Sequence, residues 1–208
     1  METVLTIFGY NISYLELIGS IFNLAAVILA TKANIWNWIS SFIAQLCFFF
    51  LFWYNGLYGN AILQIYFTYI CIISIIRWRK TDNMEDKGLI WMSTKLRIKT
   101  TILNIGFIIL GWLLLSNIGV IFPSLKSLNP LMDVTIMVMS ITGVNLISRK
   151  YIESWIVWMI NDIICIGLFF ATGVYIVGIE YIIITGITVY GLMNWIKIKN
   201  GKVASILR

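Results

Sequence analysis

The sequence predicts an all-α integral membrane protein with seven transmembrane helices, and three observations support this fold class. Hydrophobic residues make up 60% of the chain and charged residues only 12%, with a mean hydropathy of +0.91. That balance lies far from the composition of a soluble domain. The other two observations are a series of long apolar runs and a strong bias in where the positive charges fall.

The apolar runs have the length of membrane spans, because a helix needs about 20 residues to cross a hydrocarbon core of roughly 30 Å. They are continuous and do not alternate with polar residues, which favours helices over strands. Helices also satisfy their own backbone hydrogen bonds in lipid. In chain order, the predicted spans are residues 15–31, 36–53, 60–77, 100–122, 131–148, 154–172 and 174–194.

The positive charges concentrate on one of the two sides of these predicted spans. One side receives only Lys126, and the other receives every further Lys and Arg. Positive residues concentrate on the cytoplasmic side of membrane proteins. The chain is therefore expected to have its N-terminus outside and its C-terminus in the cytoplasm. The cytoplasmic group is Lys32, Arg77, Arg79, Lys80, Lys87, Lys95, Arg97, Lys99, Arg149, Lys150, Lys197, Lys199, Lys202 and Arg208.

An internal repeat appears when the sequence is shifted by 117 positions against itself. The aligned pairs join scarce residue types: Trp38 with Trp155, Gly56 with Gly173, and Trp78 with Trp195. Each repeat holds three spans, and one span joins the repeats, so both enter the membrane in the same direction. This is a 3+1+3 arrangement of parallel repeats, as in SWEET transporters, which bind substrate between the repeats.

The repeat divides the chain into five predicted parts. They are an outer N-terminal segment (1–14), a first three-helix repeat (15–80), a cytoplasmic linker with the joining helix and outer loop (81–130), a second three-helix repeat (131–197), and a cytoplasmic tail (198–208).

The predicted span 154–172 carries a carboxylate near its middle. An Asp at the centre of a membrane helix costs about 2.5–3.5 kcal/mol on insertion scales, so Asp162 is a functional candidate. Trp155, Trp158 and Asp162 follow the spacing i, i+3, i+7 and fall within roughly a 60° arc of one helix face. Trp rings beside a carboxylate suit a flat, aromatic solute, and the carboxylate also suits a positive charge on it.

The repeat places further polar and aromatic residues at similar depths, on the second and third spans of each half. The predicted substrate site is Trp38, Gln45, Gln64, Trp155, Trp158, Asn161, Asp162, Glu180 and Tyr190. In a competing interpretation, Asp162 has only a structural role and forms hydrogen bonds with a neighbouring helix. Trp78 and Trp195, near the cytoplasmic ends of their spans, are expected to be interfacial anchors.

Enzyme chemistry has little support in the sequence. The chain has no His, no G-x-S-x-G nucleophile motif and no G-x-x-x-x-G-K-[ST] loop for ATP. Its three Cys all fall within apolar runs, where a thiol usually acts as a small hydrophobe. We therefore expect no catalytic residues, no cofactor and no metal site. Because the positive charges follow the membrane topology, we also expect no nucleic-acid partner.

Residues 14–198 resemble the PnuC family of vitamin and nucleoside transporters. The residues that carry the resemblance are Leu15 to Gly19, Leu57 to Gly59, Leu63 to Ile65, Ser148 to Trp155 with Trp158, Gly173 to Tyr175, and Glu180 to Ile183. The resemblance implies facilitated diffusion of nicotinamide riboside or a related solute across the bacterial cytoplasmic membrane. It also implies a homotrimer, and trapping of the solute by a separate cytoplasmic kinase.

The chain departs from that family at two positions that concern the substrate. Nicotinamide riboside members usually have Asn where this chain has Asp162, and another Asn where it has Ala44. Thiamine and deoxyribonucleosides therefore remain alternative substrates. Two other hypotheses also remain open: proton-coupled transport through Asp162 or Glu180, and a membrane scaffold or receptor that transports nothing.

Overall fold

The computed structural model describes residues 3–7, 10–56, 58–81, 84, 87–121, 129–173 and 175–206. These residues divide into two compact units, residues 1–88 with 200–208 and residues 89–199. Two residues of the charge analysis, Lys126 and Arg208, lie outside the described residues.

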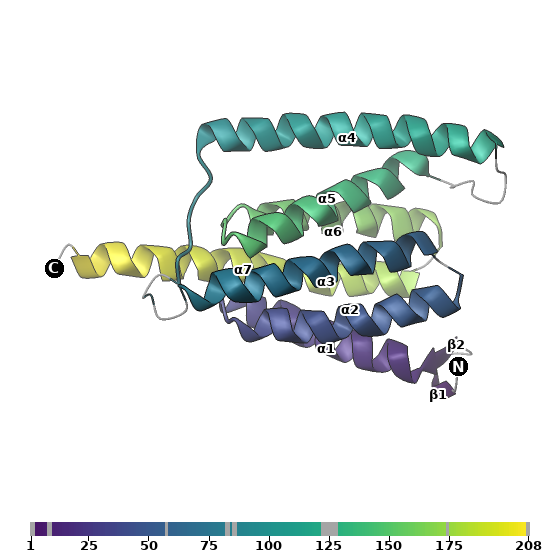
Figure 1. The fold of residues 1–208 in the computed structure, drawn as a ribbon, viewed down its shortest axis with the longest axis horizontal. Coiled ribbons are helices and arrows are strands. Elements are labelled where there is room, and N and C mark those ends of the chain that lie inside the picture. The colour runs from purple at the N-terminus through teal and green to yellow at the C-terminus, as the bar shows by residue number, and fades with distance from the viewer. Residues whose placement is uncertain are drawn as a thin grey trace. The chain divides into compact units, whose positions relative to one another are not determined.

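The predicted fold class is confirmed, because seven described helices are long and apolar enough to cross a membrane. Figure 1 traces them along the chain. They are α1 (Tyr14–Thr31), α2 (Trp36–Tyr54), α3 (Tyr58–Arg79), α4 (Thr94–Ile121), α5 (Pro130–Ser148), α6 (Ser154–Ala171) and α7 (Tyr175–Ile206).

Two helices extend well beyond the predicted apolar runs, because hydropathy marks the membrane-spanning part of a helix and not its ends. Helix α4 begins six residues early, where the Ser93 hydroxyl accepts a hydrogen bond from the Leu96 N–H at 3.3 Å. This is the interaction of a helix N-cap. Helix α7 continues from the apolar run to Ile206 and has 32 residues, and no proline interrupts it.

Two short strands precede α1, which the sequence did not predict. Strands β1 (Thr3–Ile7) and β2 (Tyr10–Ser13) form an antiparallel pair. The Ser13 hydroxyl then accepts a hydrogen bond from the Glu16 N–H at 3.2 Å and caps α1. Glu16 lies in the first turn of α1. Its negative charge is favourable there because the N-terminus is the positive end of the helix dipole.

The helices α1 and α5 end in the same type of turn, 117 residues apart. After α1, the Ala33 N–H donates to Ala30 O and the Asn34 N–H to Leu29 O. These two bonds define a Schellman motif. After α5, Lys150 and Tyr151 make the matching bonds to Ile147 O and Leu146 O. Ala33 (φ 49°) and Lys150 (φ 61°) both adopt the left-handed conformation, which costs a non-glycine residue about 1–2 kcal/mol.

Each unit also contains one edge-to-face pair of tryptophans. Trp38 and Trp78 have ring centroids 5.6 Å apart and an interplanar angle of 86°. Trp155 and Trp195 give 5.5 Å and 87°. The aligned tryptophans of the two sequence repeats therefore pack in the same local geometry. The prediction that Trp78 and Trp195 are interfacial anchors was wrong, because both side chains are 0% exposed and pack against the partner ring.

The segment that leads into α4 is fastened to the loop between α5 and α6. Ile90 donates its N–H to Lys150 O and accepts from the Ile152 N–H. The Glu153 carboxylate accepts from the Met92 N–H at 3.0 Å and from Arg97 Nε at 2.8 Å. Glu153 is 8% exposed. Hydrogen bonds of this kind to an ionised group are about twice as strong as neutral ones.

Candidate functional site

Trp155 lies at the start of α6 and packs against α7. Its side chain is 2% exposed and meets the Trp195 ring. A Cβ added to Gly191 of α7 would lie 2.6 Å from the Trp155 ring, so only glycine leaves room for the indole there. The Trp155 Nε1 is buried and has no hydrogen-bond partner within the described chain.

Asp162 lies two turns further along α6 and also faces α7. It is 3% exposed, and its Oδ2 lies 3.0 Å from Thr188 Oγ1. The Thr188 hydroxyl lies 3.0 Å from Ile184 O as well. A hydroxyl has only one proton to donate, so the carboxylate and the backbone carbonyl compete for it.

Trp158 and Asn161 face the other neighbour of α6, which is α5. A Cβ added to Gly143 of α5 would lie 2.8 Å from the Trp158 ring. The Asn161 Nδ2 donates to Ser140 Oγ at 3.3 Å. The Asn161 Oδ1 is buried and has no partner within the described residues.

The predicted common face of α6 is thus divided between two neighbours. Trp155 and Asp162 pack toward α7, while Trp158 packs toward α5 with Asn161. The i, i+3, i+7 spacing correctly groups the three residues in a narrow arc. It does not show where the boundary between α5 and α7 falls within that arc.

Buried polar atoms without a partner are concentrated around the predicted site residues. In the second unit of the described chain they are Trp155 Nε1, Asn161 Oδ1 and Ser154 Oγ. In the first unit they are Trp38 Nε1 and Gln64 Oε1. Leaving such a group unsatisfied costs about 1–3 kcal/mol. Native proteins rarely tolerate this without a reason, and a bound polar solute is one.

Three other predicted site residues differ in their surroundings. Glu180 is exposed in its unit, and Tyr190 is 54% exposed. Gln45 is half-buried on α2. Their roles stay predictions.

Thr188 and Ser154 were not among the predicted site residues. Thr188 is 2% exposed and Ser154 is 0% exposed. A signal for Thr188 is present in the sequence, because Thr188, Gly191 and Trp195 follow the same i, i+3, i+7 spacing on α7 that Trp155, Trp158 and Asp162 follow on α6. Ser154 directly precedes Trp155, and nothing in its sequence context marks it.

The seven membrane-length helices, with aromatic and polar side chains buried between α6 and its neighbours, define a multi-pass helical membrane protein. Residues 13–197 match the family described as nicotinamide mononucleotide transporter. The chain belongs to this family of membrane transporters.

Named relatives and a solved structure agree with that assignment. The nicotinamide riboside transporter PnuC of Escherichia coli is 29% identical over 208 residues, covering 90% of this chain and 87% of the relative. The riboflavin/roseoflavin transporter RibM of Streptomyces davaonensis is 25% identical over 195 residues, covering 91% and 87%. The crystal structure of the vitamin B3 transporter PnuC shares the fold, with a TM-score of 0.66 and 19% identity over 90% of this chain and 83% of that one.

Proposed function

We propose that the chain moves a flat, vitamin-like or nucleoside-like solute across the cytoplasmic membrane by facilitated diffusion. The observation that carries this proposal is the buried row on α6, in which Trp155 has an unpartnered Nε1 two turns before the buried Asp162. The indole offers a hydrogen-bond donor at its unpartnered Nε1. The carboxylate offers an acceptor and a negative charge.

The named relatives support a solute with a planar ring. One is a nicotinamide riboside transporter and another a riboflavin/roseoflavin transporter. Nicotinamide riboside and thiamine both carry a positively charged ring, and Asp162 favours such a cation because the charges are opposite. Deoxyribonucleosides are the neutral alternative, for which Asp162 would accept a hydrogen bond.

The remaining parts of the proposal follow from the sequence and the family. The N-terminus lies outside and the C-terminus in the cytoplasm of the bacterial inner membrane, because the Lys and Arg residues gather on one side. The protein assembles as a homotrimer, and a separate cytoplasmic kinase traps the solute.

Flux into proteoliposomes tests the proposal. The purified chain is reconstituted and given radiolabelled nicotinamide riboside, thiamine, riboflavin and deoxyribonucleosides one at a time. We expect saturable entry of one chemical class that stops at equal concentrations inside and outside. A panel without saturable flux would overturn the proposal and favour the scaffold or receptor hypothesis.

Proton coupling is a second candidate, favoured by the buried Asp162. Intramembrane carboxylates form proton relays in many transporters. Under this hypothesis, an inward proton gradient drives accumulation above the equilibrium level. Accumulation that is unchanged when an ionophore removes the gradient would reject it.

A further inference from the structure

A long cavity lies between α4 and α5, away from the residues assigned to the solute. Its volume is about 520 Å³, and none of the nine predicted site residues lines it. We propose that this α4–α5 groove binds an anionic glycerophospholipid, with an acyl chain along the seam and the headgroup at Arg149.

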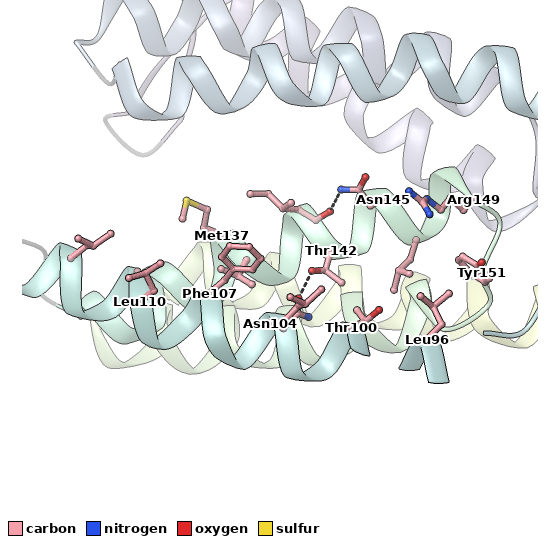
Figure 2. Close-up of a pocket in the computed structure, with 16 residues that line it drawn as sticks. Leu96, Thr100, Asn104, Phe107, Leu110, Met137, Thr142, Asn145, Arg149 and Tyr151 are labelled. Carbon is pink, nitrogen blue, oxygen red and sulfur yellow. Dashed lines mark hydrogen bonds between the residues drawn. The ribbon is translucent and has the colours of Figure 1, made fainter. Parts of the chain in front are cut away.

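The groove follows most of the seam between the two helices, from Leu96 to Leu114 on α4 and from Met137 to Leu146 on α5. Leu96, Leu103, Leu110 and Leu114 line it from α4, and these positions span about 27 Å at the helical rise of 1.5 Å per residue. Figure 2 shows Arg149 at the same end as Leu96 and Tyr151, with Leu110 toward the other end. The groove therefore has the length to hold an extended chain.

The interior of the groove is apolar even where polar side chains line it. Thr142 Oγ1 donates a hydrogen bond to Asn104 Oδ1 at 2.7 Å, and both residues line the cavity (Figure 2). Asn104 Nδ2 donates to Met139 Sδ at 4.0 Å, and Asn145 Nδ2 donates to Ile141 O at 2.7 Å. These side chains have partners within the protein and do not require a polar group from the occupant. An acyl chain fits such a wall without leaving a polar group unpaired.

One end of the groove carries positive charge. Arg149 lines the cavity and is exposed, and Lys95 and Lys99 are exposed on the first turns of α4. The nearby Glu153 is already engaged by Arg97 and the Met92 N–H. Basic residues at the cytoplasmic surface attract anionic headgroups by about 1 kcal/mol each, so the lipid is expected to be acidic.

The placement of α4 explains why a lipid and not a side chain fills the seam. None of its 25-residue membrane span is buried inside the structure. Apolar helices gain no hydrophobic energy from association in lipid, and close approach depends on small side chains. Close approach occurs at Gly111, where an added Cβ would lie 2.6 Å from the Val134 side chain of α5. The other α4 positions that line the groove include four leucines and Phe107, and these large side chains leave room for a chain beside that contact.

Native mass spectrometry of the detergent-purified full chain, with phosphatidylglycerol or phosphatidylcholine added in equal amounts, tests the headgroup. Arg149→Gln is compared with Lys32→Gln, which removes the equivalent exposed charge 117 residues earlier, after α1. We expect wild type to retain phosphatidylglycerol in preference to phosphatidylcholine. Arg149→Gln should weaken that retention about fivefold, and Lys32→Gln should leave it unchanged. Equal retention of both lipids, or equal losses in both variants, would overturn the proposal.

A second pair of variants tests the seam itself. Thr100 lines the groove, whereas its neighbour Thr101 is exposed and does not. Thr100→Trp should displace lipid of either headgroup, and Thr101→Trp should not. The same spectra report the number of chains in the particle. A change in that number with Thr100→Trp, without any change in bound lipid, would show that a second copy and not a lipid fills the groove.

Discussion

The two three-helix repeats share their scaffold and differ in the chemistry placed on it. The tryptophan pairs and the helix-ending turns agree between the repeats. Asp162 lies seven residues after Trp155, and Thr188 lies seven residues before Trp195. The two side chains are hydrogen-bonded to each other. The corresponding positions of the first repeat hold Gln45 and Cys71. The tryptophan pairs therefore hold helices together in both repeats, while the position two turns deeper is where the repeats have specialised.

Removing one ring of each tryptophan pair should give the largest effect and the same effect in both repeats. Trp195→Ala and Trp78→Ala each delete a fully buried indole, which typically costs about 3–5 kcal/mol. Denaturant unfolding in micelles measures the loss. Trp36→Ala, at a side chain 60% exposed, is the control and should change little. A large difference between Trp195→Ala and Trp78→Ala would break the symmetry claimed for the scaffold.

Glu153→Ala should destabilise the second repeat alone. The residue 117 positions earlier is the exposed Trp36, so the first repeat has no equivalent anchor. Breaking a buried ion pair costs about 3–5 kcal/mol, and the half-exposed Arg97 puts this one at or below the lower end. Hydrogen exchange at Ile90 and Met92 should rise sharply. Exchange that stays slow would mean that the Ile90 bonds to the α5–α6 loop suffice.

Gly191→Ala should produce a smaller loss, localised at Trp155. The new Cβ meets the indole at 2.6 Å, and overpacking of this kind typically costs about 1–3 kcal/mol. Gly186→Ala, on the same helix with nothing within 4 Å, is the matched control and should be neutral or stabilising. If both variants unfold at the same denaturant concentration, the Trp155 ring does not occupy the place assigned to it.

Much of the fold can be predicted from the sequence, because membrane spans are recognised by their length and hydropathy. Five of the seven helices begin and end within two residues of the predicted runs. The start of α4 and the end of α7 were not predicted, because a helix can continue through charged residues that lie outside its membrane span. The burial of Trp78 and Trp195 could not be predicted, because an aromatic ring near the end of a span is equally consistent with an interfacial belt residue and with a packing partner.

The candidate site was less fully predictable. Asp162 and Trp155 stand out in sequence because one is expensive in lipid and the other aligns with Trp38. Thr188 shares the i, i+3, i+7 spacing with Gly191 and Trp195, but a threonine is common in a membrane helix, so this spacing alone is a weak signal. Its role depends on the antiparallel register of α6 and α7, which sequence spacing alone does not set.

Calorimetric titration of the purified chain tests whether Asp162, at the specialised position on α6, recognises the solute. Nicotinamide riboside, thiamine, riboflavin and deoxyribonucleosides are titrated into wild type, Asp162→Asn and Gln45→Glu. We expect one class to bind, and Asp162→Asn to weaken a cationic solute roughly ten- to hundredfold, because a hydrogen bond to a charged group contributes about 1.5–3 kcal/mol. Binding that is unchanged in Asp162→Asn and altered in Gln45→Glu would contradict the account and move recognition to the first repeat.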